Sequence, residues 1–424
     1  EVPDAEAALA GARDIIAEMA SDNASLRARL RTLYESTGLV VSKAAKEEDS
    51  VYSSYYDFSQ SAAKIAGHRV LALDRGEREG FLKVSVEVDE AKALDACLRP
   101  FLRGQSPSAA QVKLAVEDGY SRLIQPSLER ELRAALTQKA AEGAIQVFGE
   151  NLRQLLLAPP IKGKVAMGLD PGYRMGCKVA VVDATGKVLD TAVVYPVPEF
   201  KRVDAAKRTI KEMIRRHKVE IIAIGNGTAG RETELFAAEV IREIDMPVSY
   251  MVVSEAGASV YSASKLAAEE FPEYDVNLRS AVSIARRLRD PLAELVKIDP
   301  KAVGVGQYQH DMPPARLAAA LDGVVEDCVN TVGVDLNTAS APLLERVAGL
   351  TKTTAKNIVK YREESGEFAS RRQLLKVKGV GPKAFEQCAG FLRLPGAADP
   401  LDATAVHPES YAAAHALLDA CGYT

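Results

Sequence analysis

Two glycines and two lysines in the C-terminal third of the chain have the types and spacing of a phosphate-binding turn. Gly379 and Gly381 stand two positions apart, Lys378 and Lys383 flank them, and Pro382 follows at once. Glycine lets the backbone turn tightly and approach a ligand closely, and proline is well tolerated at the first position of a helix. The free N–H groups at such a helix start attract an anion, helped by the positive end of the helix dipole. The pattern therefore predicts a turn that binds phosphate.

A second turn of the same kind lies thirty residues upstream. Here Gly349 forms the turn, Thr351 can cap the helix that follows, and Lys352 and Lys356 lie on that helix. Two such segments in tandem are typical of a helix-hairpin-helix pair, which grips the backbone of a nucleic acid without reading its bases. The alternative is that each turn is an ordinary glycine-capped connection between packed helices.

The charge of this segment differs from that of the whole chain. Residues 333–395 contain eleven Lys or Arg and six Asp or Glu, whereas the chain of 424 residues has a formal net charge of −4. A local basic patch in an acidic protein indicates a dedicated surface for a polyanion. The predicted nucleic-acid-binding residues are Gly349, Thr351, Lys352, Lys356, Lys378, Gly379, Gly381 and Lys383.

Two carboxylates in the middle of the chain raise the question of metal-dependent chemistry. Asp170 ends the first predicted strand of that region, and Glu255 comes just after the last one. Two divalent cations need at least three acidic ligands, and the other expected positions carry none. The strand at 220–225 runs into Gly-Asn-Gly, and the helix at 278–288 has no acidic residue. We therefore expect no catalytic residue, metal site or cofactor, with Asp170 and Glu255 as vestigial candidates only.

A histidine and an aspartate in the connecting region could also suggest a catalytic dyad or a metal ligand pair. His310 and Asp311 are adjacent, but the chain offers no further ligand at a metal-binding spacing around them. We expect the two residues to form a structural hydrogen-bonding pair.

The elements that must position these residues suggest several domains. Residues 159–290 show three hairpin-like strands followed by alternating helices and strands, which is the order of a ribonuclease-H-like fold. The expected fold is multidomain and mainly α, with this α/β domain and an all-α tandem helix-hairpin-helix domain. The first expected division is 1–158, mainly helical (including 42–66) with a short strand pair near 68–88, at 68–74 and 80–88. The second is 159–290, which includes a basic amphipathic helix at 200–217. The others are a helical connector at 291–332, the hairpins at 333–395, and a linker with the start of a truncated segment at 396–424.

Composition limits the classes of protein to which the chain can belong. Apolar residues make up 47% of the chain, but no run of about eighteen of them exists, so no membrane span is expected. The five cysteines are odd in number, scattered and not at metal-ligand spacing, which favours a reducing cytoplasm. The chain shows no heptad repeat, and we expect a monomer.

Five longer stretches resemble the Tex family of bacterial transcription accessory proteins, and the resemblance extends over about residues 40 to 424. The stretches that carry it, together with the tandem hairpins, are Met167–Arg174, Ile224–Thr233, Ser254–Ser262, Gly304–Asp311 and Val332–Ala339.

The resemblance implies a YqgF-type, RuvC-resolvase-like domain followed by the helix-hairpin-helix domain. Resolvase-like relatives use acids on the first strand, near a later strand end and on the last helix. Asp170 matches the first position and Glu255 a second, but Ser280 stands near the third and cannot replace a carboxylate ligand. Family members usually add an N-terminal helix-turn-helix-like segment and a C-terminal OB-fold RNA-binding domain, which we expect to be incomplete or absent in this chain.

The expected function is that of a nucleic-acid-binding transcription accessory factor without catalysis. It would bind the phosphate backbone of RNA, DNA or both without sequence preference, and RNA polymerase or another transcription protein is a candidate partner. One alternative is a metal-dependent, structure-specific nuclease that uses Asp170 and Glu255. The other is a protein-interaction scaffold in which the hairpins only pack.

Overall fold

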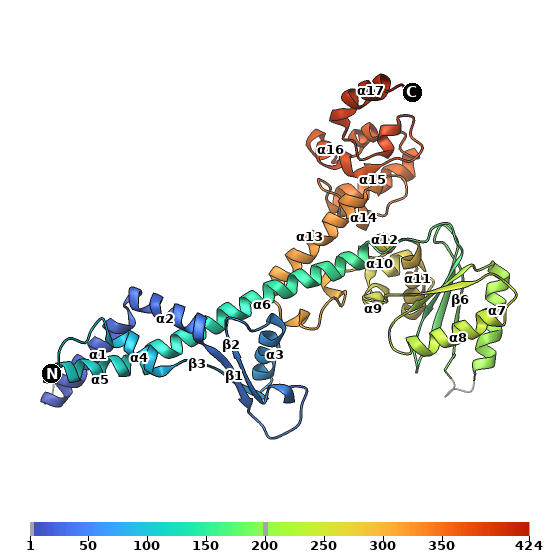
Figure 1. Cartoon of the computed structure of the whole chain (residues 1–424). Coiled ribbons are helices and arrows are strands. Elements are labelled where there is room, and N and C mark those ends of the chain that lie inside the picture. Colours follow the sequence, from blue (N-terminus) through green and yellow to red (C-terminus); the bar gives the residue numbers. More distant parts are fainter. Residues whose placement is uncertain (1–3, 198–201, 424) are drawn as a thin grey trace. The chain divides into compact units, whose positions relative to one another are not determined.

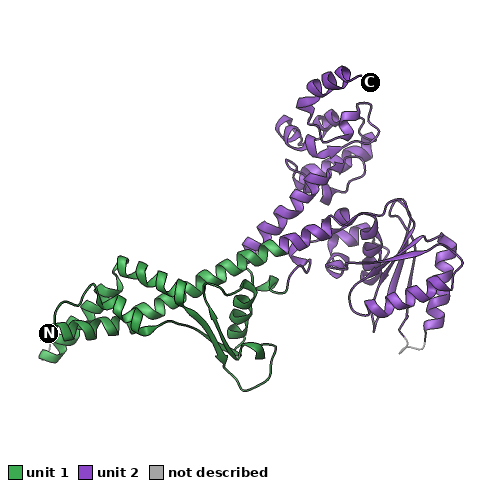
Figure 2. Ribbon diagram, viewed as in Figure 1, with its two compact units in different colours: residues 1–147, 307–313 green, residues 148–306, 314–424 purple. Residues whose placement is uncertain are grey.

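The computed structural model describes residues 4–197 and 202–423, which fall into two compact units (Figures 1 and 2). Unit 1 comprises residues 1–147 and 307–313, and unit 2 comprises residues 148–306 and 314–424. None of the described helices is both long enough and apolar enough to cross a membrane.

Unit 1 is built mainly from helices whose starts are capped by polar side chains. Asp4, Asn23, Asp89 and Ser106 each accept a hydrogen bond from a backbone N–H three residues on, which satisfies a donor that the helix itself cannot. A π-helical turn at Tyr120–Ile124 joins the last two helices. The helices are α1 (Ala5–Ser21), α2 (Ala24–Thr37), α3 (Gly67–Arg78), α4 (Glu90–Leu98), α5 (Pro107–Gly119) and α6 (Gln125–Leu156), and the last nine residues of α6 are assigned to unit 2.

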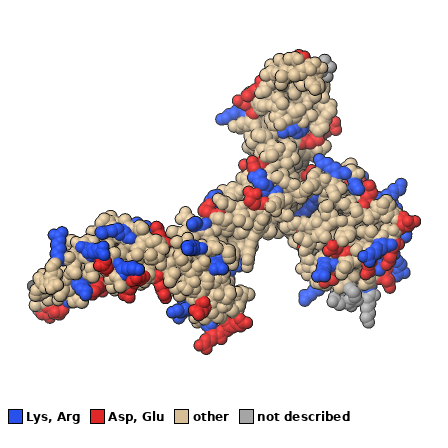
Figure 3. Space-filling model, in the orientation of Figure 1, with Lys and Arg blue, Asp and Glu red and all other residues tan. Residues whose placement is uncertain are grey.

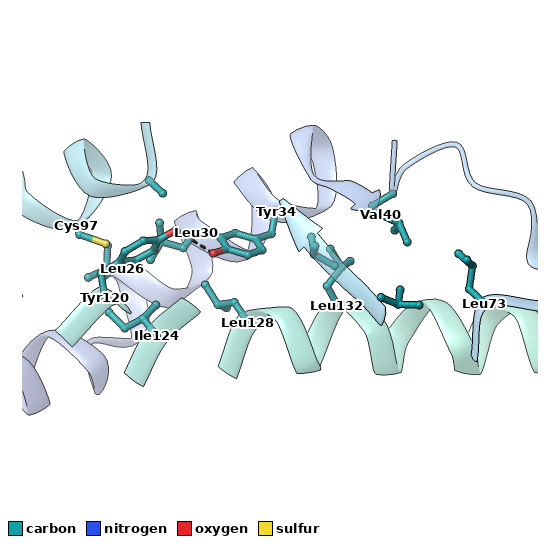
Figure 4. Packing of buried hydrophobic residues seen from close by; sticks show 14 of the residues in the cluster. Leu26, Leu30, Tyr34, Val40, Leu73, Cys97, Tyr120, Ile124, Leu128 and Leu132 are labelled. Carbon is teal, nitrogen blue, oxygen red and sulfur yellow. Dashed lines mark hydrogen bonds between the residues drawn. The ribbon is translucent and has the colours of Figure 1, made fainter. Parts of the chain in front are cut away.

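The core of unit 1 lies between α2, α6 and a small sheet (Figure 4). Leu26 and Leu30 of α2 and Leu128 of α6 are fully or almost fully buried. The buried hydroxyls of Tyr34 and Tyr120 hydrogen-bond to each other at 3.0 Å, so neither polar group is left unpaired in the apolar interior.

A three-stranded antiparallel sheet completes unit 1, and it corrects the predicted pattern. The strands are β1 (Leu39–Ala44), β2 (Asp57–Ser61) and β3 (Leu82–Glu87), with β1 in the middle. The strand expected at 80–88 is confirmed, and its residues alternate between buried and exposed. The strand expected near 68–74 is wrong, because these residues lie in α3. The expected helix at 42–66 is also wrong, because β1 and β2 occupy part of it.

The central part of unit 2 is a five-stranded mixed sheet in the order β6-β5-β4-β7-β8. The first three strands are antiparallel, and β7 and β8 run parallel to β4. This is the expected ribonuclease-H-like arrangement. The strands are β4 (Ala166–Asp170), β5 (Cys177–Val182), β6 (Val188–Val194), β7 (Ile221–Gly225) and β8 (Ser249–Val253).

Helices cover both faces of this sheet (Figure 1). Met167 and Leu169 of β4 pack with α7 (Val203–His217) and α8 (Gly230–Arg242), whereas Ala166 packs with α11 (Val276–Arg289) on the other face. Residues 200 and 201 of the helix expected at 200–217 lie outside the described part. Shorter helices follow β8 and α11, namely α9 (Ala258–Ser262), α10 (Lys265–Glu270) and α12 (Pro291–Leu295).

The remaining elements of unit 2 are helical. They are α13 (Pro314–Val332), α14 (Ala341–Glu345), α15 (Lys352–Ser365), a 3-10 turn at Arg371–Lys376, α16 (Pro382–Cys388) and α17 (Tyr411–Ala420). A two-residue parallel pair, β9 (Val334–Asp335) with β10 (Leu392–Arg393), joins the beginning and end of the hairpin region.

The segment 307–313 belongs to unit 1, and it contains the histidine–aspartate pair. Asp311 accepts a hydrogen bond from Arg75 Nε at 2.6 Å and forms ion pairs with Arg75 and Arg78. The structural role expected for the aspartate therefore holds, but its partners are arginines of α3 and not His310.

Candidate nucleic-acid interface and acidic pocket

Both predicted hairpins are present, and each depends on a glycine in the left-handed region of backbone conformation. Gly349 has a φ angle of +81° and Gly379 one of +90°. Side chains other than glycine adopt such angles only at a cost, because their Cβ then crowds the following carbonyl. These two positions therefore require glycine if the turns are to close.

The two hairpins are repeats of one structure, offset by thirty residues. The Leu350 N–H donates to the Val347 carbonyl at 3.1 Å, and the Val380 N–H donates to the Val377 carbonyl at the same distance. The helices after the turns start alike as well, with bonds of 2.8 and 2.9 Å from Ala355 to Thr351 and from Phe385 to Gly381.

Each hairpin packs against the helix of the other repeat. A Cβ added to Gly349 would lie 2.5 Å from Cβ of Gln387 on α16, and one added to Gly379 would lie 3.3 Å from Cγ2 of Thr354 on α15. Nδ2 of Asn357 on α15 donates to the carbonyl of Lys378 at 2.7 Å. This mutual packing holds the two turns in fixed positions relative to each other, as a two-point clamp requires.

The two helix starts differ in how their N–H groups are used. Thr351 and Thr354 form a capping box at the start of α15, in which each side chain accepts from the other's backbone N–H. Gly381 has no side chain to cap α16. The first residue of α16, Pro382, has no N–H, and no side chain caps the N–H groups of the residues that follow, so an anion can accept their hydrogen bonds.

The lysines predicted to bind phosphate are exposed. Within the described part of the chain, Lys352, Lys356, Lys378 and Lys383 form no ion pair with an acidic side chain. Other basic residues of the region are already engaged, such as Arg346 with Asp322 at 2.7 Å. The cationic groups beside the hairpins thus remain available to a polyanion.

Asp170 and Glu255, with Ser280 of α11, form a site at the ends of β4 and β8 that is named the acidic pocket. Alternate residues of a strand face opposite sides of its sheet, and this places Asp170 on the side covered by α11. Gly168 on the same side allows β4 to approach the helix closely, because an added Cβ would lie 2.3 Å from the Ala281 carbonyl. This contact brings Ser280 of α11 to Asp170, and its hydroxyl donates to Oδ2 of the carboxylate.

Glu255 approaches the same pocket from the loop after β8. Its backbone N–H donates to Oδ1 of Asn226 at 3.1 Å, and its carboxylate lies directly over Gly227. A Cβ at Gly227 would be 1.5 Å from Oε1 of Glu255, so only glycine leaves room for this side chain. The Gly-Asn-Gly turn after β7 therefore supplies space and a hydrogen-bond acceptor in place of a carboxylate ligand.

Burial changes the acidity of both carboxyl groups. It raises the pKa of Asp170, against the opposing effects of the Ser280 hydrogen bond and of Lys178 and Arg287. It also raises the pKa of Glu255, and the negative charge of Asp170 adds to this effect. The effect of Asp170 on the pKa of Glu255 indicates that the two predicted carboxylates lie near each other.

The residues of this pocket do not fit a pair of divalent cations. No group of three or more His, Cys, Asp or Glu side chains that could hold a metal occurs among residues 4–197 and 202–423. The third position, on α11, carries the Ser280 hydroxyl, a weak neutral ligand compared with a carboxylate. The arrangement lacks the acidic ligands that two-metal hydrolysis requires.

Sequence reasoning missed two cations beside this pocket, Lys178 and Arg287. Arg287 is one of several arginines on α11, and only its depth of burial, with 4% of its surface exposed, distinguishes it. A signal was nevertheless available, because Arg287 stands seven residues after Ser280 and hence on the same face of the helix.

Family models match the chain in a fixed order. A Tex central region-like model matches residues 1–148, and a Tex protein YqgF-like domain matches residues 164–289. A helix-hairpin-helix motif matches residues 329–393, and an HHH domain matches residues 399–424.

Curated relatives are similar over nearly the whole chain. Protein tex of Bordetella pertussis is 51% identical over 97% of this chain and 54% of its own length. Transcriptional accessory protein Tex of Neisseria gonorrhoeae is 49% identical over 100% of this chain and 57% of its own length. S1 RNA-binding domain-containing protein 1 of Homo sapiens is 44% identical over 91% of this chain and 40% of its own length.

The chain thus spans about half the length of the curated relatives it matches. Within that span, the matches to the Tex central region, the Tex YqgF-like domain and the helix-hairpin-helix motif follow one another along the chain. The fold, the paired hairpins and the sequence identity of about one residue in two all support the same assignment: the chain belongs to the Tex family.

Proposed function

We propose that this chain binds the phosphate backbone of nucleic acids through its two hairpins. The observation that carries the proposal is the pair of interlocked turns with exposed, unpaired lysines beside them. Contacts to phosphate carry no base information, so binding is expected to be independent of sequence and to weaken steeply with salt. Over the face of unit 1 shown in Figure 3, charges of both signs are interspersed.

The cellular role we propose is that of a transcription accessory factor. Relatives at about 50% identity include a transcriptional accessory protein, and a human relative is named for an RNA-binding domain. RNA and DNA remain equal candidates for the ligand, because the hairpins offer groups that both backbones accept. RNA polymerase or another transcription protein is the proposed protein partner, with the chain acting as a monomer.

We also propose that the YqgF-like domain performs no catalysis in this chain. The acidic pocket supports this proposal, since it combines two carboxylates with a serine and two cations. A cleavage assay on branched and single-stranded DNA and RNA with Mg²⁺ or Mn²⁺ tests it. Cleavage that disappears in an Asp170→Asn variant would overturn this part of the proposal and favour a structure-specific nuclease.

Fluorescence-anisotropy titrations of single-stranded RNA and duplex DNA at several salt concentrations test the binding proposal. A Lys352→Glu/Lys383→Glu variant should bind every sequence more weakly, by about tenfold or more, and its plot of log affinity against log salt should be shallower by about two units.

The matched control is Lys83→Glu/Lys139→Glu, which changes the net charge equally at exposed lysines of unit 1. Equal losses in the two double variants would show that overall charge, and not the hairpins, governs binding. Absence of binding by the unmodified chain at low salt would favour a protein-interaction scaffold.

A further inference from the structure

Two cations face the carboxylate pair of the acidic pocket from different elements. The first is Lys178 on β5, the direct cross-strand partner of Asp170 in the antiparallel pairing of β4 and β5. Directly opposed residues of such a pair place their side chains on the same face of the sheet. The ammonium lies beside the turn after β4, 3.3 Å from the position that a Cβ on Gly172 would take. It opposes the rise in pKa of both Asp170 and Glu255.

The second cation is Arg287, which lies on α11, the helix that packs on the same face of the sheet as Asp170. Its Nη1 donates to the carbonyls of Ser254 and Ala256, at 2.8 and 2.7 Å. These carbonyls stand on either side of Glu255, so the guanidinium holds the loop that positions this acid. Burial lowers the pKa of Arg287 to about 10, while Glu294, Glu255 and Asp170 oppose the loss of its charge. The side chain is therefore cationic at neutral pH.

Burial and hydrogen bonds hold the side chain of Arg287 in a fixed position. The residue is 4% exposed, and an arginine is rarely buried to this extent unless its charge is compensated. Among the described residues it forms no direct ion pair with Asp170 or Glu255, and its Nη2 has no hydrogen-bond partner. Oε2 of Glu255 is also buried without a partner. Arg287 therefore interacts with Glu294, Glu255 and Asp170 through its charge, without a direct ion pair to Asp170 or Glu255.

The charges of the pocket balance without any metal. When ionised, Asp170 and Glu255 carry two negative charges, which Lys178 and Arg287 match with two positive ones. Glu294, which also acts on the pKa of Arg287, is paired with Lys297 at 2.8 Å. A divalent cation needs an excess of negative ligands, and a nearby positive side chain repels it. Both cations come from elements that pack directly on β4, so the folded sheet itself brings them into place.

We propose that Lys178 and Arg287 are built-in counter-ions that take the electrostatic place of divalent metal in the acidic pocket. They neutralise Asp170 and Glu255, and Arg287 also fixes the loop that carries Glu255. The pocket is then a charge-balanced structural centre that excludes Mg²⁺ and Mn²⁺. Two consequences can be measured: the unmodified chain does not bind Mn²⁺ there, and removal of the cations creates a site.

Mn²⁺ is the probe, and the electron paramagnetic resonance signal of the free ion is the measurement. The full chain should leave this signal unchanged at submillimolar Mn²⁺. Lys178→Gln, at a half-buried position, should fold normally. It should reduce the free-ion signal at a Mn²⁺ concentration at least about tenfold below any at which the unmodified chain does so, because one repelling charge near the site is gone. Lys178→Gln/Arg287→Gln should bind more tightly still, and Mn²⁺ should raise its melting temperature.

Two further variants test whether the gain of Mn²⁺ binding arises at the acidic pocket. Lys187→Gln removes an exposed lysine from the turn at the far end of β5 and should create no Mn²⁺ binding. Asp170→Asn added to Lys178→Gln should abolish the new binding, because it removes one of the two carboxylate ligands. If Lys178→Gln/Arg287→Gln does not fold, Lys178→Gln alone still tests whether removal of a cation creates a Mn²⁺ site.

Three results would overturn the proposal. They are Mn²⁺ binding by the unmodified chain that Asp170→Asn abolishes, no gain of Mn²⁺ binding in Lys178→Gln, and an equal gain in Lys187→Gln. The proposal concerns the acidic pocket alone and is separable from backbone binding by the hairpins. Mn²⁺ binding without any cleavage of nucleic acid would overturn it and leave the proposed function intact.

Discussion

Single residues decide whether the hairpins can form, and Gly379 offers the sharpest test. Its φ angle is +90° and its α-carbon faces Thr354. Gly379→Ala should lower the free energy of unfolding by about 1 to 2 kcal/mol, because alanine is strained at this angle, and should weaken nucleic-acid binding. Chemical denaturation and anisotropy titration measure the two effects.

Gly396→Ala provides the control for that substitution. Gly396 also has a positive φ, +81°, but nothing lies within 4 Å of an added Cβ, and the residue is outside both hairpins. The stability of this variant should fall by a similar amount while its nucleic-acid affinity stays unchanged. Loss of affinity in both variants would mean that global stability, and not hairpin geometry, controls binding.

The acidic pocket predicts a pH dependence of stability at the residue scale. Burial raises the pKa of Asp170 above its ordinary value of 3.8, so the folded state binds this proton more tightly than the unfolded state. The charged carboxylate therefore costs stability at neutral pH, and the cost disappears as pH falls through the folded pKa towards 3.8.

Asp170→Asn isolates this contribution. The variant should be at least as stable as the unmodified chain at neutral pH, and its advantage should shrink as the pH is lowered. Denaturation curves of the two proteins across the acidic range measure the difference, in which the carboxyl groups that do not interact with Asp170 cancel. Glu255 does not cancel, because its pKa depends on the charge of Asp170. A variant that loses stability at neutral pH and regains it in acid would contradict the sign derived from burial.

At the scale of elements, the start of α15 depends on its capping box. Thr351 accepts from the backbone N–H of Thr354, and Thr354 accepts from that of Thr351 at 2.7 Å. Thr351→Ala should cost about 1 kcal/mol of folding free energy, since it leaves a helix donor without its side-chain partner. Thr353→Ala, an exposed change inside the same helix, should cost much less. Equal losses would show that the cap contributes nothing specific.

Two independent cores predict the behaviour of the molecule as a whole. The buried cluster around Leu128 belongs to unit 1, and the clusters on the two faces of the large sheet belong to unit 2. Leu128→Ala should destabilise unit 1 by roughly 2 to 5 kcal/mol, because it leaves a cavity in a tightly packed interior. Differential scanning calorimetry should show one transition shifted and another unchanged. A single transition that shifts as a whole would mean that the units unfold together.

The distribution of charge belongs to the same scale. The whole chain is slightly acidic, with a formal net charge of −4, while the lysines beside the hairpins are exposed and unpaired in the described structure. Under the proposed function, long-range attraction to a polyanion is expected to be weak, and short-range contacts at the hairpins are expected to determine binding. This is the physical reason why two charge reversals at Lys352 and Lys383 are expected to have so large an effect.

Local patterns were sufficient for the hairpins and for the order of elements in the large sheet. The turn at Gly379 depends on neighbours within a few residues, as do the helix start at Pro382 and the cap at Thr351, and local sequence encodes such features directly. The same reasoning failed at 68–74, where the continuous apolar run at Val70–Leu73 fits a buried helix and a buried strand equally well. Packing of α3 against β3 decided between them.

The character of the acidic pocket was decided by the tertiary structure alone. The sequence identified Asp170 and Glu255 as acids at strand ends and Ser280 as the missing third ligand. It could not show that Ser280 donates to Asp170 across 110 residues, or that Lys178 and Arg287 face the same space. Those contacts follow from the register of β4 with β5 and from the close approach of α11 at Gly168. Both are long-range packing relations, which no local pattern of residues encodes.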